Sequence, residues 1–210
     1  MKKTLFFAIS ILALIFFSCE KKNSQETTSS IPDFVKLKVG NYWVYDFFKV
    51  DSNGVATDQG KTDSSYIEKD TLINGDKYFI KNSHSYMFGS RRSILKDSSG
   101  YLLQRIPDGS SIILFARDNY TDIFISDTVD NLFLRKDMMT GKDSTVSVPA
   151  GTFITRSMCY VATPLDPAYP WGMRRVYYIY GKDTDQIKYT MCFWSDPGYY
   201  EARLVRYHVE

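Results

Sequence analysis

The residues with the right chemistry for catalysis or metal binding are few and widely spaced. His84 and His208 are the only histidines among the 210 residues, and neither accompanies a Gly-x-Ser-x-Gly nucleophile motif or a Cys-x-x-Cys pair. A nucleophilic triad needs a histidine between a hydroxyl or thiol and an orienting carboxylate. A zinc site needs three or four ligands in a recognisable spacing. The sequence therefore predicts no catalytic residue, no metal site and no cofactor.

The three cysteines fall into two groups. Cys159 and Cys192 lie in strand-like segments near the C-terminus, and in an oxidising compartment they could form a disulfide. As free thiols they would instead behave as small buried hydrophobic residues, and the sequence favours neither alternative. Cys19 is different, because it stands at the junction between the most apolar segment of the chain and a strongly polar one.

The segment before Cys19 has the layout of a secretory signal. Lys2 and Lys3 are followed by about a dozen apolar residues between Leu5 and Phe17. That run is short for a spanning helix, which needs roughly 20 apolar residues. Residues 20–30 are charged and rich in Ser and Thr, and they contain no apolar residue to bury. We therefore expect residues 1–18 to be a signal peptide, residues 19–30 a disordered tether, and residues 31–210 a single domain.

The residues around Cys19 resemble the lipobox of bacterial lipoproteins. In that family a cysteine after an apolar stretch and a small residue, here Phe16-Phe17-Ser18, receives a diacylglycerol. The signal is then cut before the cysteine, and the new amine usually gains a further acyl chain such as palmitate. The resemblance implies that Cys19 anchors the protein to a membrane, since two or three acyl chains hold a protein stably. The residue after the cysteine is Glu20 rather than Asp, which implies the outer membrane of a Gram-negative bacterium, on its periplasmic or surface side.

The charge of the chain argues against a nucleic-acid partner. Loss of residues 1–18 removes two lysines and no acidic residue, so the 26 basic residues fall to the number of the acidic ones, 24. Nucleic-acid binding needs a basic excess or a concentrated basic stripe. The two arginine pairs, Arg91-Arg92 and Arg174-Arg175, are too small for either.

The pattern after residue 30 is that of an all-β domain. Asn74-Gly75 separates two strand-like runs, residues 65–73 and 76–80, and this dipeptide favours the type I′ turn of a hairpin. Short strands with Gly, Asn, Asp or Pro between them recur about every ten residues, which is typical of an antiparallel meander. No long helical rhythm occurs, so we expect few or no helices. The alternation is unclear between Asp118 and Asp143, where we expect a short helix or a long loop.

The aromatic residues predict that the sheet is strongly curved. The chain contains 16 tyrosines, and the run from Asn41 to Phe48 places large rings on both faces of one strand. A flat sheet with one solvated face would need apolar residues on one face only. We therefore expect a single antiparallel sheet that curls into a half-open barrel.

Four motifs also resemble, in their order, the envelope proteins related to the DUF3108-like group. They are residues 34–45, 70–78, 148–153 and 203–207. The resemblance implies a half-open barrel similar to the lipoprotein-carrier fold, without an established enzymatic activity. It supplies no functional residue for this chain.

These observations predict that the chain is a non-catalytic, lipid-anchored envelope protein. We expect it to bind or scaffold an apolar or amphipathic ligand on the curved sheet. A glycan-binding protein is the main alternative, because the proline-rich loop at residues 163–172 could present Tyr169 and Trp171 to a sugar. The sequence favours the simpler role of Trp171 as a plug at the barrel end. A hydrolase with paired carboxylates is a weaker alternative, and the sequence recommends no particular pair.

Overall fold

The chain folds into one antiparallel sheet of twelve strands. The computed structural model describes residues 34–170, 172–193 and 196–210, and within them no helix is present and none could cross a membrane. The strands are β1 (Tyr42–Val50), β2 (Ala56–Ile73), β3 (Asp76–Ser85), β4 (Gly89–Ser98), β5 (Tyr101–Arg105), β6 (Ser111–Ala116), β7 (Ile123–Val129), β8 (Phe133–Val148), β9 (Gly151–Pro164), β10 (Arg174–Gly181), β11 (Asp185–Met191) and β12 (Tyr199–His208). The expectation of an all-β domain is confirmed.

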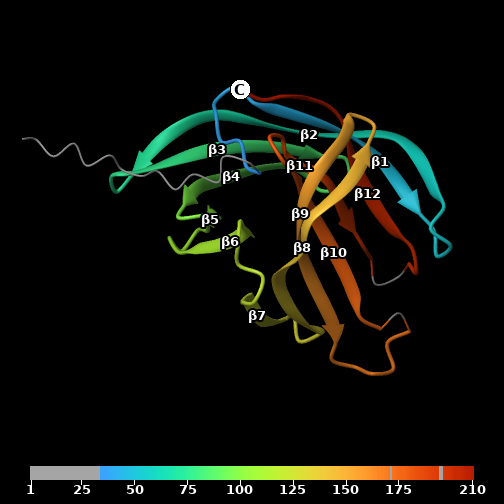
Figure 1. The fold of residues 1–210 in the computed structure, drawn as a ribbon. Helices are drawn as coiled ribbons and strands as arrows, with labels where there is room; N and C mark the ends of the chain where they lie inside the picture. The colour runs from blue at the N-terminus through green and yellow to red at the C-terminus, as the bar shows by residue number, and fades with distance from the viewer. Residues whose placement is uncertain (1–33, 171, 194–195) are drawn as a thin grey trace, which may run out of the picture.

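The sheet is nearly closed into a barrel. Its spatial order is β6-β5-β4-β3-β2-β1-β12-β11-β10-β9-β8-β7, so strands that follow one another in sequence pair with each other except β6 and β7, and β1 also pairs with β12. The two edge strands, β6 and β7, face each other across the remaining opening. In Figure 1 the long strands β2 and β3 arch over one side of the molecule, and β8, β9 and β10 descend on the other. The predicted half-open barrel is confirmed.

The hairpin of β2 and β3 follows directly from its turn residues. Ile73 pairs with Asp76, so Asn74 and Gly75 alone form the turn. Both have positive φ angles, 53° and 85°, as a type I′ turn requires at its two central residues. This turn lets β2 and β3 continue as a long, twisted pair beside β1.

The segment from Asp118 to Asp143 corrects the sequence-based expectation. It is neither a helix nor a long loop, because it contains β7 and the first part of β8. The register between these strands shifts after Ile123, and β8 shifts twice against β9, near Gly141. Each bulge adds a residue that reverses the alternation of inward and outward side chains. The period of two was therefore broken in the sequence although the strands are continuous.

The buried side chains form two groups along the barrel. Trp43, Tyr45 and Phe47 alternate on β1 and point inward, and they pack with Ile187 and Leu204. The second group contains Phe34, Val35, Leu95, Leu102, Phe115, Ala116, Met139, Met158 and Tyr180. Rings on the outer face are only half covered, for example Phe48 beneath the guanidinium of Arg203, 4.3 Å from the ring centre. This arrangement explains the aromatic residues on both faces of β1.

An arginine with a mostly buried side chain, Arg156, holds the two sides of the opening together. Arg156 on β9 donates hydrogen bonds to the carbonyl of Arg117, just after β6, and to Asp118 Oδ1 at 3.0 Å. Its Nε also donates to Asp143 at 3.2 Å. The guanidinium lies over the Phe34 ring, 4.7 Å from its centre. The end of β6 is thereby attached to β9 although the two strands do not pair.

Candidate functional site

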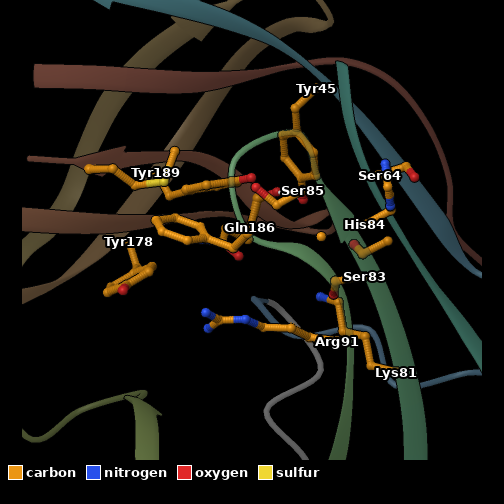
Figure 2. A pocket seen from close by; sticks show the side chains of 14 residues that line it. Tyr45, Ser64, Lys81, Ser83, His84, Ser85, Arg91, Tyr178, Gln186 and Tyr189 are labelled. Atoms are coloured by element: carbon orange, nitrogen blue, oxygen red, sulfur yellow. Dashed lines mark hydrogen bonds between the residues drawn. The ribbon is translucent and has the colours of Figure 1, made fainter. Parts of the chain in front are cut away.

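An open pocket lies where β2, β3 and β4 face β10 and β11. It has a volume of about 260 Å³, and its lining includes three tyrosines, four serines, one lysine and one arginine. In Figure 2 these side chains converge from strands far apart in the sequence. Ligand sites are concave and combine aromatic or apolar side chains with convergent polar groups, so this pocket is the candidate site.

Strand alternation explains how the polar groups reach the pocket. Lys81, Ser83 and Ser85 occupy alternate positions of β3 and therefore share one face of the sheet. Ser83 is paired with Ser65 on β2 and with Arg91 on β4. The three strands thus present a row of polar side chains toward the pocket.

A buried carboxylate fixes one wall of the pocket. Asp63 on β2 is only 2% exposed, and it accepts hydrogen bonds from Ser85 Oγ at 3.1 Å and from the backbone N–H of Tyr86 at 2.6 Å. The hydroxyl of Tyr189 on β11 donates to the same carboxylate. Burial, and then the nearby charge of Asp63, raise the pKa of Tyr189, so its hydroxyl keeps the proton that it donates. Asp63 thus ties β2, β3 and β11 together behind the pocket.

The lysine of the pocket is largely neutralised by the protein itself. Lys81 Nζ lies 3.7 Å from Asp185 Oδ1, and both side chains are mostly buried. The ammonium group is also 4.5 Å from the centre of the Trp43 ring, within the range of a cation–π contact. Asp185 additionally accepts a hydrogen bond from the backbone N–H of Gln186 at 2.5 Å. Lys81 therefore has an anionic partner before any ligand binds.

Arg91 is placed differently from Lys81. Its guanidinium lies 5.2 Å from the ring centre of Phe88, which follows β3 in the β3–β4 turn. Figure 2 shows the Arg91 side chain extending from β4 toward the strand that carries Tyr178. Among the described residues no carboxylate forms an ion pair with Arg91. Arg91 is therefore a cation at an exposed position of the pocket rim, without a carboxylate partner among the described residues.

The structure describes only some of the residues that the sequence predicts to be functional. Cys19, the predicted signal peptide, the predicted tether and Trp171 fall outside the described residues. Tyr169 lies in the loop after β9, where its backbone N–H donates to the Asp166 carbonyl and its own carbonyl accepts from Gly172. It does not line the pocket. The structure therefore does not bring Tyr169 to the site that we describe.

The two remaining cysteines are free thiols in the structure. Cys159 on β9 pairs with Tyr177 on β10, whereas Cys192 directly follows β11 on the other side of β10. Two strand spacings amount to roughly 10 Å, which exceeds the Cα separation that a disulfide can bridge, about 7 Å. Burial raises the pKa of the Cys159 thiol to about 11. The geometry thus favours the second sequence-based alternative, two separate thiols.

Sequence reasoning did not find the pocket, although one signal was present. The run Lys81-Asn82-Ser83-His84-Ser85 is polar on both faces of β3, where a core strand would be apolar on one. That pattern indicates a strand whose inner face meets a hydrated space. His84 belongs to the rim, with its Nδ1 3.2 Å from Ser90 Oγ.

Solved structures with the same fold include two proteins of the Bacteroides group. One is a "putative lipoprotein" from Parabacteroides distasonis, with a TM-score of 0.52 and 10% identity. The other is an exported protein with a YmcC-like fold from Bacteroides fragilis, with a TM-score of 0.51 and 11% identity. Each alignment covers 84% of this chain and 99% of the other. At these identities the likeness establishes the fold alone.

No protein-family model and no curated protein sequence matches the chain. The resemblance to the DUF3108-like group consequently rests on the order of its four motifs.

Proposed function

We propose that this chain is a lipid-anchored envelope protein that binds a small polar or amphipathic ligand in the pocket between β2–β4 and β10–β11, without catalysing a reaction. The observation that carries the proposal is the convergence of hydroxyl, amide and cationic side chains on one concave site. Those side chains project from paired strands rather than from loops, and rigid strands position binding groups with precision.

The envelope location is supported by two independent observations. The first 19 residues have the layout of a signal peptide and a lipobox, and the two similar folds are named as a lipoprotein and an exported protein. We propose the outer membrane of a Gram-negative bacterium as the specific location, with Cys19 as the attachment.

The lining of the pocket favours a polar or amphipathic ligand over a purely apolar one. A site for an aliphatic ligand should be lined by Leu, Ile and Phe, whereas the described residues contribute only Phe88 and Met191 as large apolar side chains beside the tyrosines. Tyrosine combines a ring face with a hydroxyl, which suits a ligand that has both kinds of surface. This observation also supports the glycan-binding alternative, now at the pocket rather than at Tyr169 and Trp171.

The carboxylates around the pocket favour binding over hydrolysis. A glycoside hydrolase needs two carboxyl groups that reach the scissile bond, and no described Asp or Glu lines the pocket. The two buried ones behind it, Asp63 and Asp185, are already engaged by donors from the protein. We therefore propose a binding protein.

The anchor is tested by replacing its attachment residue. Growth with a fatty-acid probe should label the wild-type protein, and Cys19→Ala should lose the label completely because no other residue matches the lipobox cysteine. Cys192→Ala is the matched control and should keep the label. Equal labelling of wild type and Cys19→Ala would contradict lipidation at this residue.

The pocket is tested by filling it. Mass spectrometry of the small molecules that denaturation releases from the purified mature protein should detect a ligand in the wild type. Ser83→Leu places an apolar side chain in the polar row and should reduce the released amount about tenfold or more, since it leaves neighbouring polar groups unpaired. Ser126→Leu, at an exposed position of β7, should release as much as the wild type. A release that is unchanged in Ser83→Leu would contradict the proposal.

A further inference from the structure

We infer that the ligand of this pocket carries a carboxylate group and that Arg91 binds it. The inference rests on the proposed ligand-binding function and specifies its chemistry. It is carried by the lack of an ion-pair partner for Arg91, by the donors around this residue and by the apolar wall beside it.

Of the two cations that line the pocket, Lys81 and Arg91, only Lys81 has a carboxylate partner among the described residues. Lys81 has Asp185 as its partner, and Arg135 on β8 donates to Asp137 at 2.8 and 2.6 Å. Arg92, the next residue along β4, lies 3.7 Å from Glu68. Arg91, in contrast, contacts the Phe88 ring and has no carboxylate partner among the described residues. A ligand carboxylate would supply the charge that is missing.

The groups around Arg91 are mainly donors. Ser83 is paired with Arg91 in the sheet register, so its hydroxyl lies on the same inner face. Tyr178 projects from β10 on the other side of the pocket (Figure 2), and burial raises the pKa of its hydroxyl, which therefore stays protonated. Hydroxyl donors beside a planar guanidinium match the two oxygens of a carboxylate, which arginine binds with two parallel hydrogen bonds.

The nearby acids do not oppose such a ligand strongly. Asp63 directs its oxygens to Ser85, Tyr86 and Tyr189. Asp137, which also contributes to the raised pKa of Tyr178, is paired with Arg135. The oxygens of Asp63 are thus occupied by neutral donors and those of Asp137 by Arg135, so neither carboxylate pairs with Arg91.

Phe88 supplies a surface for the rest of the ligand. Its ring lines the pocket and is 47% exposed, so it offers an apolar face to a bound molecule. Because the Arg91 guanidinium lies over this ring, a ligand that pairs with Arg91 also contacts Phe88. A pocket of about 260 Å³ suits a sugar acid or a medium-chain fatty acid, which share the carboxylate.

Calorimetric titration of the purified mature protein separates these cases with matched probes. Glucuronate is compared with glucose, and octanoate with octanol, so each pair differs mainly in the carboxylate. We expect one acid to bind at least about tenfold more tightly than its neutral counterpart. The acid that binds identifies the ligand as a sugar acid or a fatty acid.

Substitutions assign the effect to Arg91. Arg91→Gln should weaken binding of that acid by about tenfold or more, whereas Arg92→Gln, on the outer face, should change it less than about twofold. Equal binding of acid and neutral probe, unchanged in Arg91→Gln, would overturn the carboxylate inference and leave the binding function intact. If neither acid binds, the carboxylate inference is also overturned. The proposed binding function is tested separately, by the release experiment with Ser83→Leu.

Discussion

Replacement of Asp63 by alanine is expected to lower the free energy of unfolding by about 3 kcal/mol or more. Its carboxylate accepts hydrogen bonds from Ser85, the backbone of Tyr86 and Tyr189. The substitution leaves three donors at a site that is only 2% exposed, and a buried donor without an acceptor costs about 1–3 kcal/mol. Urea unfolding followed by circular dichroism measures the loss.

A second aspartate of the same strand provides the control. Asp70 on β2 forms a 2.6 Å ion pair with Lys77, and both side chains are about half exposed. Asp70→Ala should leave the free energy of unfolding almost unchanged, because exposed ion pairs contribute little to stability. Tyr189→Phe removes a single donor and should fall between the two. If Asp63→Ala were as stable as Asp70→Ala, Asp63 would not hold the three strands together.

The Asp63 network also shows why the fold was easier to predict than the site. The Asn74-Gly75 turn and the other strand boundaries depend on residues close together in the chain, and such local preferences are visible in a sequence. The bond from Tyr189 to Asp63 spans 126 residues. It forms only because β1 pairs with β12, which brings β11 opposite β2 and β3. No local pattern encodes that closure.

The positions of inward polar residues were hidden for a related reason. Ser83 and Arg91 read as ordinary strand residues, because a period of two does not say which face is inside when both faces carry polar groups. The bulge between Ile67 and Lys69 on β2 further shifts the pairing with β3. The pairing of distant strands in the nearly closed sheet is needed to show that the face with Lys81 and Arg91 lines the pocket.

Alkaline pH should destabilise the protein sharply. Burial raises the pKa values of Tyr45 and Tyr180 well above that of a free tyrosine. Burial and the nearby charge of Asp63 raise the pKa of Tyr189 as well. In the unfolded chain these tyrosines lose their protons near pH 10, so above this pH the unfolded state binds fewer protons and stability falls as pH rises. At pH 11 each of these tyrosines should lower the free energy of unfolding by about 1.4 kcal/mol, and the three together by about 4 kcal/mol. This loss is a large share of the 5–15 kcal/mol by which a typical domain is stable. Below about pH 10 their contribution is fully present.

Two measurements locate this effect in the buried tyrosines. As the pH is raised, tyrosinate absorbance should show that only some of the 16 tyrosines ionise while the protein stays folded. The remaining tyrosines should ionise together at the pH at which circular dichroism reports unfolding. Tyr180→Phe keeps the ring that packs 4.5 Å from Phe115 but removes the ionisable group. Between pH 8 and pH 11 its free energy of unfolding should therefore fall by about 1.4 kcal/mol less than that of the wild type. Tyr66→Phe, at an exposed position of β2, should follow the wild type. If all tyrosines ionised near pH 10 while the fold persisted, the interior around β1, β10 and β11 would have to be open to water, which the burial of Tyr45 and Tyr180 argues against.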